Sequence, residues 1–434
     1  MQRVAFTLLA AVPALAQIPG SLTPEVHPLL PIQTCATNRG CKTLNTKVVI
    51  DSNYRWAHVK GGYDPCVNNG VFNAATCSTA QGCAANCEIE GVNYASSGIS
   101  TSGNALTLNL FNPTGGLASP RVYLLKEDEG TYYKFRMLNK EFTYDVDVSN
   151  LPCGTNGALY FSEMSADGEQ DNKGNFAGAP YGTGYCDAQC PKQNFVNGKA
   201  NFNMTYGACC QELDIWEANS RATAYTPHPC DTRGLYKCTG ADCGAGSDRP
   251  NGICDMDGCD FNTYRLGVKN FYGRGPGFAV DTTRKFTVVT QFITANNQDR
   301  DTLVEIRRLY VQDGVVIANA ATNLTGMPEF NSIDDAYCES ELNVLGGSGT
   351  FEGRGGTAVM GQALERGMVL AMSLWWDSGS YMWWLDGKQA GDPESLRRGP
   401  CNTPVESTPA YITANYKPSV VFSNIKLGDF GTTY

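Results

Sequence analysis

The sequence predicts an all-β protein that folds as one large antiparallel sandwich over nearly the whole chain. Short segments rich in β-branched and aromatic residues recur throughout the sequence. Helical patterning with a 3.6-residue period is scarce, so these segments do not alternate with long helices as they do around a parallel α/β sheet. Glycine and proline, at 47 and 21 residues, supply frequent turns between the segments.

The individual strands are predicted from their composition. They cover residues 106–111, 121–125, 142–148, 286–294, 368–376 and 420–427. Residues 304–318 are expected to form a hairpin, because Asp313-Gly314 suits a tight turn in which both residues have positive φ. Long loops clamped by cysteines are expected to lie over one face of the sandwich.

The N-terminus has the pattern of a secretory signal peptide. Residues 1–16 combine Arg3, an apolar run over residues 5–12 and the small-x-small sequence Ala14-Leu15-Ala16. The mature chain is therefore expected to begin at Gln17 and to be a secreted, extracellular protein. No later segment has the roughly 18 consecutive apolar residues of a membrane span. Residues 17–434 contain no repeat or low-complexity linker and are expected to form a single domain.

Composition and charge exclude other classes of protein. Of 434 residues, 42% are hydrophobic and 18% are charged, which permits a large core and is unlike a disordered chain. The net charge is −10 and no run of Lys or Arg stands out. A nucleic-acid partner is therefore not expected, since such partners require a basic surface.

The 18 cysteines all follow the predicted signal peptide, and in a secreted chain this even number implies up to nine disulfides. Zinc is the alternative, because the spacing of Cys186 and Cys190 and of Cys238 and Cys243 would suit a metal. Only three histidines occur, which favours disulfides. The sequons at Asn203 and Asn323 predict N-glycosylation at the surface.

A strand with three carboxylates is the main candidate for chemistry. In Glu212-Leu-Asp-Ile-Trp-Glu217, alternation puts Glu212 and Asp214 on one face and the apolar Leu213 on the other. By the same alternation Glu217, five positions after Glu212, lies on the face opposite to Glu212 and Asp214. A β-bulge near Ile215-Trp216, which inserts one extra residue, would return Glu217 to the face of the other acids.

If the strand bulges there, its acids suit glycoside cleavage. That reaction needs one ionised carboxylate and one protonated acid, and a separation of about 5–5.5 Å gives retention through a covalent intermediate. Crowding raises the pKa of one of the acids and so keeps it protonated. The alternatives are an acidic exposed strand edge or a calcium cluster, although calcium favours flexible loops with glycine turns.

Several long motifs resemble glycoside hydrolase family 7, the secreted fungal cellulases. The main one contains the three acids and extends over residues 209–230. The other matching stretches are residues 48–58, 145–161, 181–191, 254–267, 367–375 and 420–431. The resemblance implies a concanavalin A-like β-jelly roll of two large antiparallel sheets, with a groove for a β-1,4-glucan chain. It implies hydrolysis with retention, and no cofactor or metal ion is expected.

The resemblance also assigns roles to residues. Glu212 resembles the nucleophile, Glu217 the general acid/base and Asp214 the residue that assists Glu212. The residues that resemble the substrate-binding set fall into four groups. Trp56, Trp375 and Trp384 would stack on glucose, and Tyr160, Tyr185, Asp187 and Gln189 would lie near the cleavage point. His228 resembles the active-site histidine near the product side, and Arg249, Asp257, Asp260, Arg265 and Arg398 resemble the product-site residues. Ordinary core packing is the alternative for each aromatic residue. Tyr54 stands where the family often has Trp.

A full set of disulfides follows from the same match. The implied pairs are Cys35–Cys41, Cys66–Cys87, Cys77–Cys83, Cys153–Cys401, Cys186–Cys209, Cys190–Cys210, Cys230–Cys254, Cys238–Cys243 and Cys259–Cys338. Many members have a tenth bridge to the N-terminus. This chain has Glu88 at one of its positions and no cysteine before Cys35, so no thiol is left over.

The resemblance leaves the mode of cleavage open. The segment between Cys190 and Cys209 is shorter than in members whose loops enclose a tunnel, which favours an endo-β-1,4-glucanase acting on internal bonds of cellulose. The charged product-site residues favour the alternative, a cellobiohydrolase that releases cellobiose from chain ends. A non-catalytic glucan-binding lectin is a remote third possibility. We expect a monomer without a cellulose-binding module.

Overall fold

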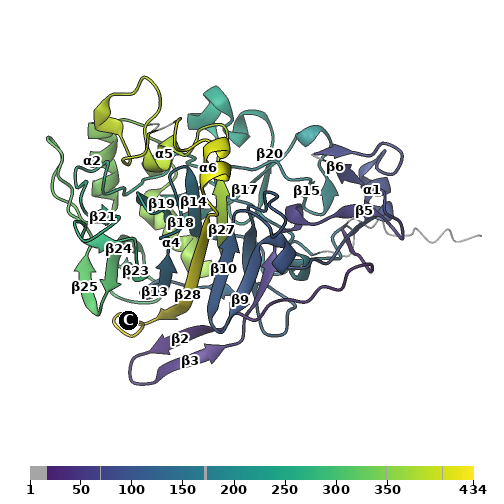
Figure 1. Cartoon of the computed structure of the whole chain (residues 1–434), viewed down its shortest axis with the longest axis horizontal. Coiled ribbons are helices and arrows are strands. Elements are labelled where there is room, and N and C mark those ends of the chain that lie inside the picture. Colours follow the sequence, from purple (N-terminus) through teal and green to yellow (C-terminus); the bar gives the residue numbers. More distant parts are fainter. Residues whose placement is uncertain (1–16, 69, 171–173, 348, 403) are drawn as a thin grey trace, which may run out of the picture.

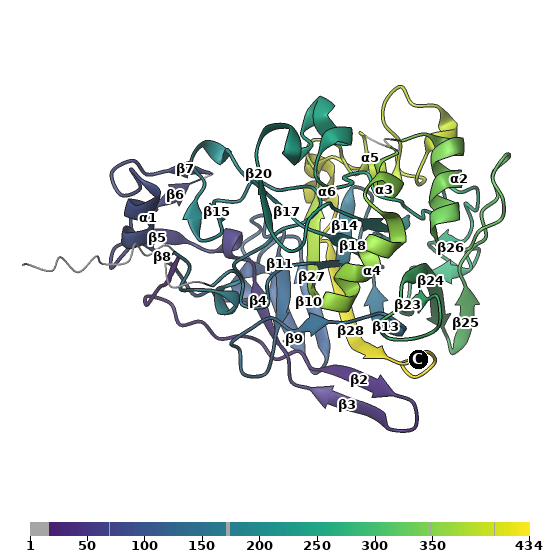
Figure 2. The same cartoon turned by 180° about the vertical axis from the view of Figure 1, so that it is seen from behind.

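The computed structural model describes residues 17–434 except 69, 171–173, 348 and 403 (Figure 1). The predicted signal peptide lies outside the described residues. Two large sheets pack face to face, which confirms the predicted sandwich (Figures 1 and 2). Within the described part of the chain, no helix has both the length and the apolar character needed to cross a bilayer.

The first sheet has ten strands. Its main path is β25 (Val315–Ala318), β24 (Leu303–Gln312), β23 (Phe286–Thr294), β13 (Lys140–Asp147), β28 (Ser419–Gly428), β10 (Ala105–Asn109) and β9 (Ile99–Ser102), joined at its margins by β2 (Ile32–Ala36), β3 (Gly40–Leu44) and β26 (Ser332–Ile333). Neighbours are antiparallel except β2, which runs parallel to β28. The predicted hairpin is confirmed, since Asp313 and Gly314 both have positive φ, 54° and 76°.

The second sheet has seven strands and carries the segment with the three acids. Its order is β19 (Thr223–His228), β18 (Glu212–Ala218), β14 (Thr155–Ser162), β27 (Met368–Trp376), β11 (Arg121–Leu125) and β4 (Lys47–Ile50), with β12 (Lys134–Phe135) beside β27. All the strands predicted from composition are present in the two sheets, with ends shifted by at most two residues.

The central strand β14 was not predicted from the sequence, since Asn156 and Gly157 weaken the strand pattern. A Cβ at Gly157 would lie 2.7 Å from Leu151 and 3.2 Å from Val420 of the facing sheet. The sheets therefore approach too closely there for a larger residue.

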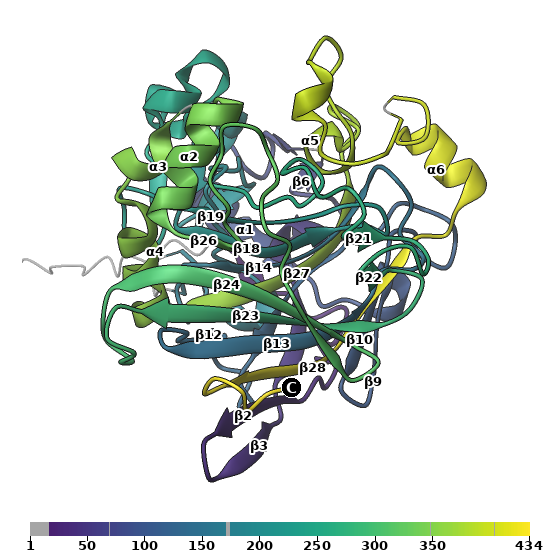
Figure 3. The same ribbon diagram turned by 90° about the vertical axis from the view of Figure 1, so that its left-hand side faces the viewer.

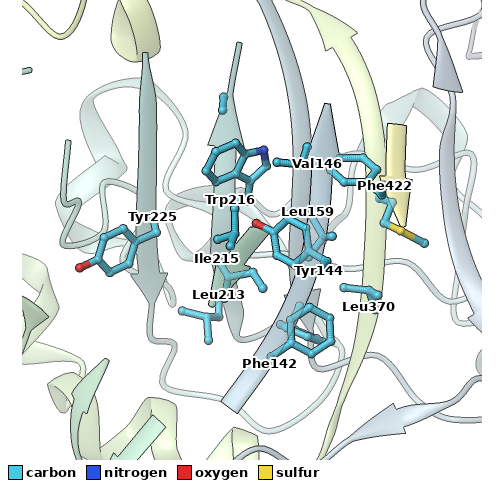
Figure 4. Packing of buried hydrophobic residues seen from close by; sticks show 14 of the residues in the cluster. Phe142, Tyr144, Val146, Leu159, Leu213, Ile215, Trp216, Tyr225, Leu370 and Phe422 are labelled. Atoms are coloured by element: carbon cyan, nitrogen blue, oxygen red, sulfur yellow. The ribbon is translucent and has the colours of Figure 1, made fainter. Parts of the chain in front are cut away.

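Alternation along the strands separates two packed faces. Leu159 and Phe161 of β14 lie in the main core between the sheets, and Ala158 and Tyr160 lie in a second cluster on the outer face. Figure 4 shows Leu213, Ile215 and Trp216 of β18 in the main core with Tyr144 and Phe422. Both faces of the seven-stranded sheet are thus covered, one by the other sheet and one by loops.

Short strands and helices connect and flank the two large sheets. The small sheets pair β1 (Ile18–Pro19), β8 (Cys87–Ile89) and β5 (Ala57–Val59); β6 (Val67–Asn68) and β7 (Val71–Phe72); β15 (Phe195–Val196) and β16 (Lys199–Ala200); β17 (Gly207–Cys209) and β20 (Tyr236–Cys238); and β21 (Tyr272–Gly273) and β22 (Val280–Asp281). The helices are α1 (Ala80–Asn86), α2 (Asp335–Leu345), α3 (Thr350–Gly353), α4 (Gly356–Arg366), α5 (Trp383–Asp386) and α6 (Pro409–Asn415). Figure 3 shows α2 and α3 on one side of the loop layer and α5 and α6 on the other.

All 18 cysteines form disulfides, but two of the implied pairs are wrong. The structure joins Cys186 to Cys210 and Cys190 to Cys209, not the reverse. Cys209 and Cys210 are adjacent, so their side chains point to opposite sides of an extended backbone. Cys210 lies in the outer cluster with Cys186, and Cys209 lies with Cys190 in a separate cysteine-rich cluster. The other seven pairs are as expected.

The Cys153–Cys401 disulfide should stabilise the fold more than Cys35–Cys41, because the two close loops with sequence separations of 248 and 6. The chain-entropy model gives losses of roughly 5 and roughly 2 kcal/mol when both cysteines of each pair are replaced by serine. Denaturant unfolding of the two double variants would measure this difference. Equal losses would contradict it.

Candidate active site

Strand β18, which carries the three acids, has the predicted bulge. Against β14, Leu213 pairs with Phe161 and Trp216 with Leu159, so three steps on β18 match two on its neighbour. Against β19, the same extra residue falls between Asp214 and Glu217. The bulge lets Ile215 and Trp216 both enter the core, while all three acids line one cavity on the outer face.

Each acid has its own hydrogen-bond partner. Glu212 Oε2 accepts a bond from the backbone N–H of Ala188 at 2.9 Å. Asp214 Oδ2 lies 3.0 Å from Nε2 of His228, whose Nδ1 donates to the carbonyl of Asp255 at 2.9 Å. Because a carbonyl only accepts, the His228 ring presents Nε2 to Asp214 in a fixed orientation.

Asn156 orients the third acid. Its Nδ2 donates to Glu217 Oε1 at 2.8 Å, and its Oδ1 accepts from the backbone N–H of Ala218 at 3.0 Å. With Oε1 occupied as an acceptor, a proton on Glu217 resides on Oε2. Sequence reasoning missed Asn156, which lies on the unpredicted strand β14.

Burial and nearby negative charge raise the pKa values of both glutamates. Burial raises the pKa of Glu217 to about 8, and the Asp214 carboxylate adds to this effect. Burial raises the pKa of Glu212 well above its usual range, and Asp214 and Asp187 raise it further. Burial alone would lower the pKa of His228, but its bond to Asp214 raises it to about 9. A cationic His228 therefore pairs with Asp214.

A network of tyrosines borders the Glu212 side of the site. Tyr160 and Tyr185 share a hydroxyl bond of 2.8 Å, and Tyr185 donates to Asp187 Oδ2 at 2.5 Å. The guanidinium of Arg121 lies 3.4 Å over the Tyr185 ring and binds Asp51 at 2.8 Å. Asp51 caps the 3₁₀ turn Ser52–Tyr54, so Arg121, another residue that sequence reasoning missed, connects the tyrosine network to Tyr54.

The acids lie in a cavity of about 940 Å³. Part of its lining comes from Cys338, Glu339, Glu341 and Leu342 of α2 and from Thr350 and Phe351 of α3. The rings of Trp375 and Trp384, which also line the cavity, stack with their centroids 5.9 Å apart. Neighbouring Trp376 and Trp383 also line the cavity. Flat aromatic faces beside carboxylates suit the apolar faces of a pyranose ring.

Asp386 holds the turn that carries Trp384. Its Oδ2 accepts from the backbone N–H of Gly154 at 2.8 Å and from Asn219 Nδ2 at 2.7 Å. Asn219 follows the last residue of β18, so the aromatic turn is tied directly to the catalytic strand. Burial raises the pKa of Asp386 to about 7.

Ion pairs fix the far end of the cavity. Asp260 binds Arg265 at 2.7 Å and Arg398 at 2.6 Å, and Arg265 also binds Glu341 of α2 at 2.7 Å. Burial alone would raise the pKa of Asp260, but Arg398 and Arg265 lower it to about 2. Burial and Asp260 raise the pKa of Glu341 to about 8. Sequence reasoning missed Glu341.

Two more predicted product-site residues complete this end. Arg249 pairs with Asp257 and donates to the carbonyl of Met256 at 2.8 Å, and that carbonyl also accepts from Gln189 at 2.7 Å. The predicted residues that line the cavity are Glu212, Asp214, Glu217, Tyr160, Tyr185, Asp187, Gln189, His228, Arg249, Asp257, Asp260, Arg265, Trp375, Trp384 and Arg398.

Trp56 alone among the predicted groove residues is not part of the cavity lining. Its ring stacks on His58 at 4.2 Å and on Tyr63 at 6.1 Å, and 39% of the residue is exposed. Tyr54 lines the cavity in this region. A role for Trp56 in binding sugar stays a prediction.

Two glutamates facing one aromatic-lined cavity on a jelly-roll sandwich define a glycoside hydrolase. Comparison with known families identifies which one. The profile of glycosyl hydrolase family 7 matches residues 19–434, and the chain belongs to that family.

This chain is similar both to proteins named as endo-acting cellulases and to proteins named as cellobiohydrolases. A protein of Aspergillus clavatus called a probable endo-beta-1,4-glucanase is 48% identical, over 99% of this chain and 97% of its own length. The solved structure of the Humicola insolens endocellulase EGI matches with a TM-score of 0.86 and 42% sequence identity. A family 7 cellobiohydrolase from Daphnia pulex matches with a TM-score of 0.90 and 41% sequence identity. Both comparisons cover 96% of this chain and 100% of the solved one.

The pKa of Glu217 predicts the alkaline side of the pH profile. A protonated Glu217 exists below its pKa, so kcat/KM should fall as the pH rises through about 8. Asp214→Asn removes a neighbouring anion, lowers the pKa of Glu217 and should move this fall to lower pH. Asn156→Ala removes a bond that favours the anion and should move it to higher pH. The pH dependence of kcat/KM, measured with a soluble aryl cellobioside, shows both shifts. If the alkaline fall moved in the same direction in the two variants, this account would be contradicted.

Proposed function

We propose that this protein is a secreted, retaining endo-β-1,4-glucanase that cleaves internal bonds of a cellulose chain. The observation that carries the proposal is the bulge in β18, which brings Glu212 and Glu217 to one cavity. A glucan chain lying on Trp375 and Trp384 would present a glycosidic bond to both acids.

The first step forms a covalent intermediate. A carboxylate oxygen of Glu212 attacks the anomeric carbon, the bond from that carbon to the leaving oxygen breaks, and Glu217 Oε2 gives its proton to that oxygen. The Ala188 N–H stabilises ionised Glu212, and cationic His228 keeps the negative charge of Asp214 paired.

The second step returns the enzyme to its starting state. Glu217, now ionised, takes a proton from water, the hydroxyl oxygen bonds to the anomeric carbon, and the bond to Glu212 breaks. Two inversions give net retention. Asp214 lies beside both glutamates, so its charge opposes their simultaneous ionisation.

The lining of the cavity supports endo action. None of its lining residues comes from 191–208, the short segment that folds into the β15–β16 hairpin. The Aspergillus relatives named endo-beta-1,4-glucanases, at 47–49% identity, also favour this mode. Cellobiohydrolase remains the second candidate, because all five charged product-site residues line the cavity.

The remaining features of the proposal concern the chain as a whole. Residues 17–434 are proposed as one secreted, monomeric catalytic domain. Asn203 and Asn323 are both exposed, as glycan attachment requires.

Glu212→Gln should abolish turnover while leaving oligosaccharide binding intact, because the amide fills the same space without being a nucleophile. The expected loss in kcat is at least about 1,000-fold, with a cellotetraose Kd within about threefold of the original. Rate measurements and calorimetric titration test the two parts. Full activity in this variant would contradict the assignment of Glu212 as the nucleophile. Sugar binding without turnover in the unaltered protein would instead establish the lectin alternative.

Viscosity separates the two cleavage modes. An endo enzyme should lower the viscosity of soluble carboxymethylcellulose early, with few reducing ends released per unit of viscosity lost. Parallel assays of viscosity and reducing sugar make the comparison. Steady cellobiose release without the early fall in viscosity would establish the cellobiohydrolase alternative.

A further inference from the structure

Arg308 is a fully buried cation in the core of the sandwich. It belongs to β24 of the ten-stranded sheet and is 0% exposed. Among the described residues, no carboxylate lies within ion-pair distance of its guanidinium. A buried charge without a counter-ion is costly, so its presence requires a reason.

The hydrogen bond made by Arg308 reaches the catalytic strand. Its Nη2 donates to the carbonyl of Ile215 in the facing sheet, while Nε and Nη1 have no hydrogen-bond partner in the described part of the chain. The guanidinium carbon lies 4.4 Å from the ring of Tyr225 and 6.0 Å from that of Trp216. A delocalised guanidinium tolerates such aromatic surroundings better than an ammonium does.

Ile215 is the residue that the bulge leaves outside the strand ladder. Pairing with β14 passes from Leu213 to Trp216, and pairing with β19 passes from Asp214 to Glu217, so Ile215 has a register partner on neither side. A buried carbonyl without a partner destabilises the conformation that exposes it. Arg308 satisfies that carbonyl from across the core.

We propose that Arg308 is a positioning residue for catalysis, which holds the bulge that brings Glu217 to the face of Glu212. Without the bond to Ile215, a regular strand becomes more favourable, and its parity turns Glu217 away. The inference rests on the proposed role of Glu217 as acid. It assigns a function in the reaction to a residue that touches neither substrate nor cavity.

The dependence of rate on the leaving group distinguishes positioning from a general effect on stability. A 2,4-dinitrophenyl leaving group departs without a proton, whereas a phenyl leaving group needs the acid. In Arg308→Met, kcat/KM for phenyl cellobioside should fall at least about 100-fold, the scale of a misplaced catalytic group. For 2,4-dinitrophenyl cellobioside the fall should stay within about threefold. Assays run well below the melting temperature of each variant.

Thr290 provides the matched control. It pairs directly with Arg308 across β23 and β24, is also fully buried, and its hydroxyl has no hydrogen-bond partner in the described part of the chain. Thr290→Val therefore removes a polar group from the same layer without affecting the bond to Ile215. Its kcat/KM should be unchanged for both substrates.

Two further variants make the outcome decisive. Glu217→Gln, assayed on the same two substrates, tests the role of Glu217 as the acid. If kcat/KM falls by the same factor for both substrates, that role is contradicted. Suppose instead that Glu217→Gln loses activity on phenyl cellobioside but keeps it on 2,4-dinitrophenyl cellobioside. If Arg308→Met then loses activity equally on both substrates, or on neither of them, only the proposal for Arg308 fails. Arg308→Lys keeps a positive charge but lacks the planar guanidinium. Its kcat/KM should depend on the leaving group in the same way as that of Arg308→Met. Failure of both Arg308 variants to fold would assign the residue to folding and overturn the proposal.

Discussion

One extra residue in β18 is the constraint on which the active site depends. A regular strand would place Glu212 and Glu217 on opposite faces, one in the core and one in the cavity. The bulge lets Ile215 and Trp216 both pack inward and returns Glu217 to the cavity. The same distortion leaves Ile215 without a register partner, and the fully buried Arg308 of the opposite sheet donates to its carbonyl. The chemistry on one face is thus linked to the packing on the other.

The crowding of carboxyl groups is the second constraint. Glu212, Asp214, Asp187 and Glu217 share one cavity, and burial raises the pKa values of both glutamates. The site offsets part of this repulsion with His228 against Asp214 and with backbone and amide donors to the glutamates. In the proposed mechanism, the proton retained on Glu217 is the one that acid catalysis requires.

Rigid support for the site comes from both covalent and polar contacts. The disulfides of Cys209 and Cys210 anchor the residues just before β18, and Asp386 ties the residue just after it to the turn of Trp384. Asp260 gathers Arg265 and Arg398 at the product end. A catalytic group on a strand fixed at both ends keeps its geometry better than one on a free loop.

The sequence by itself determined the sandwich, most of its strands, the need for a bulge and the acids that the bulge unites, because these depend on local alternation and on residue type. It did not determine β14, since Gly157 is required by the close approach of Val420 from another sheet. Only the tertiary structure decided which of the adjacent Cys209 and Cys210 meets Cys186, because partner choice depends on which side of the backbone each partner lies. The same holds for Asn156, Glu341 and Arg308, whose roles arise from contacts between residues more than 60 positions apart. The motif of Trp56 predicts a place in the groove, and the fold puts its neighbour Tyr54 in the cavity lining, so the role of Trp56 in binding sugar stays a prediction.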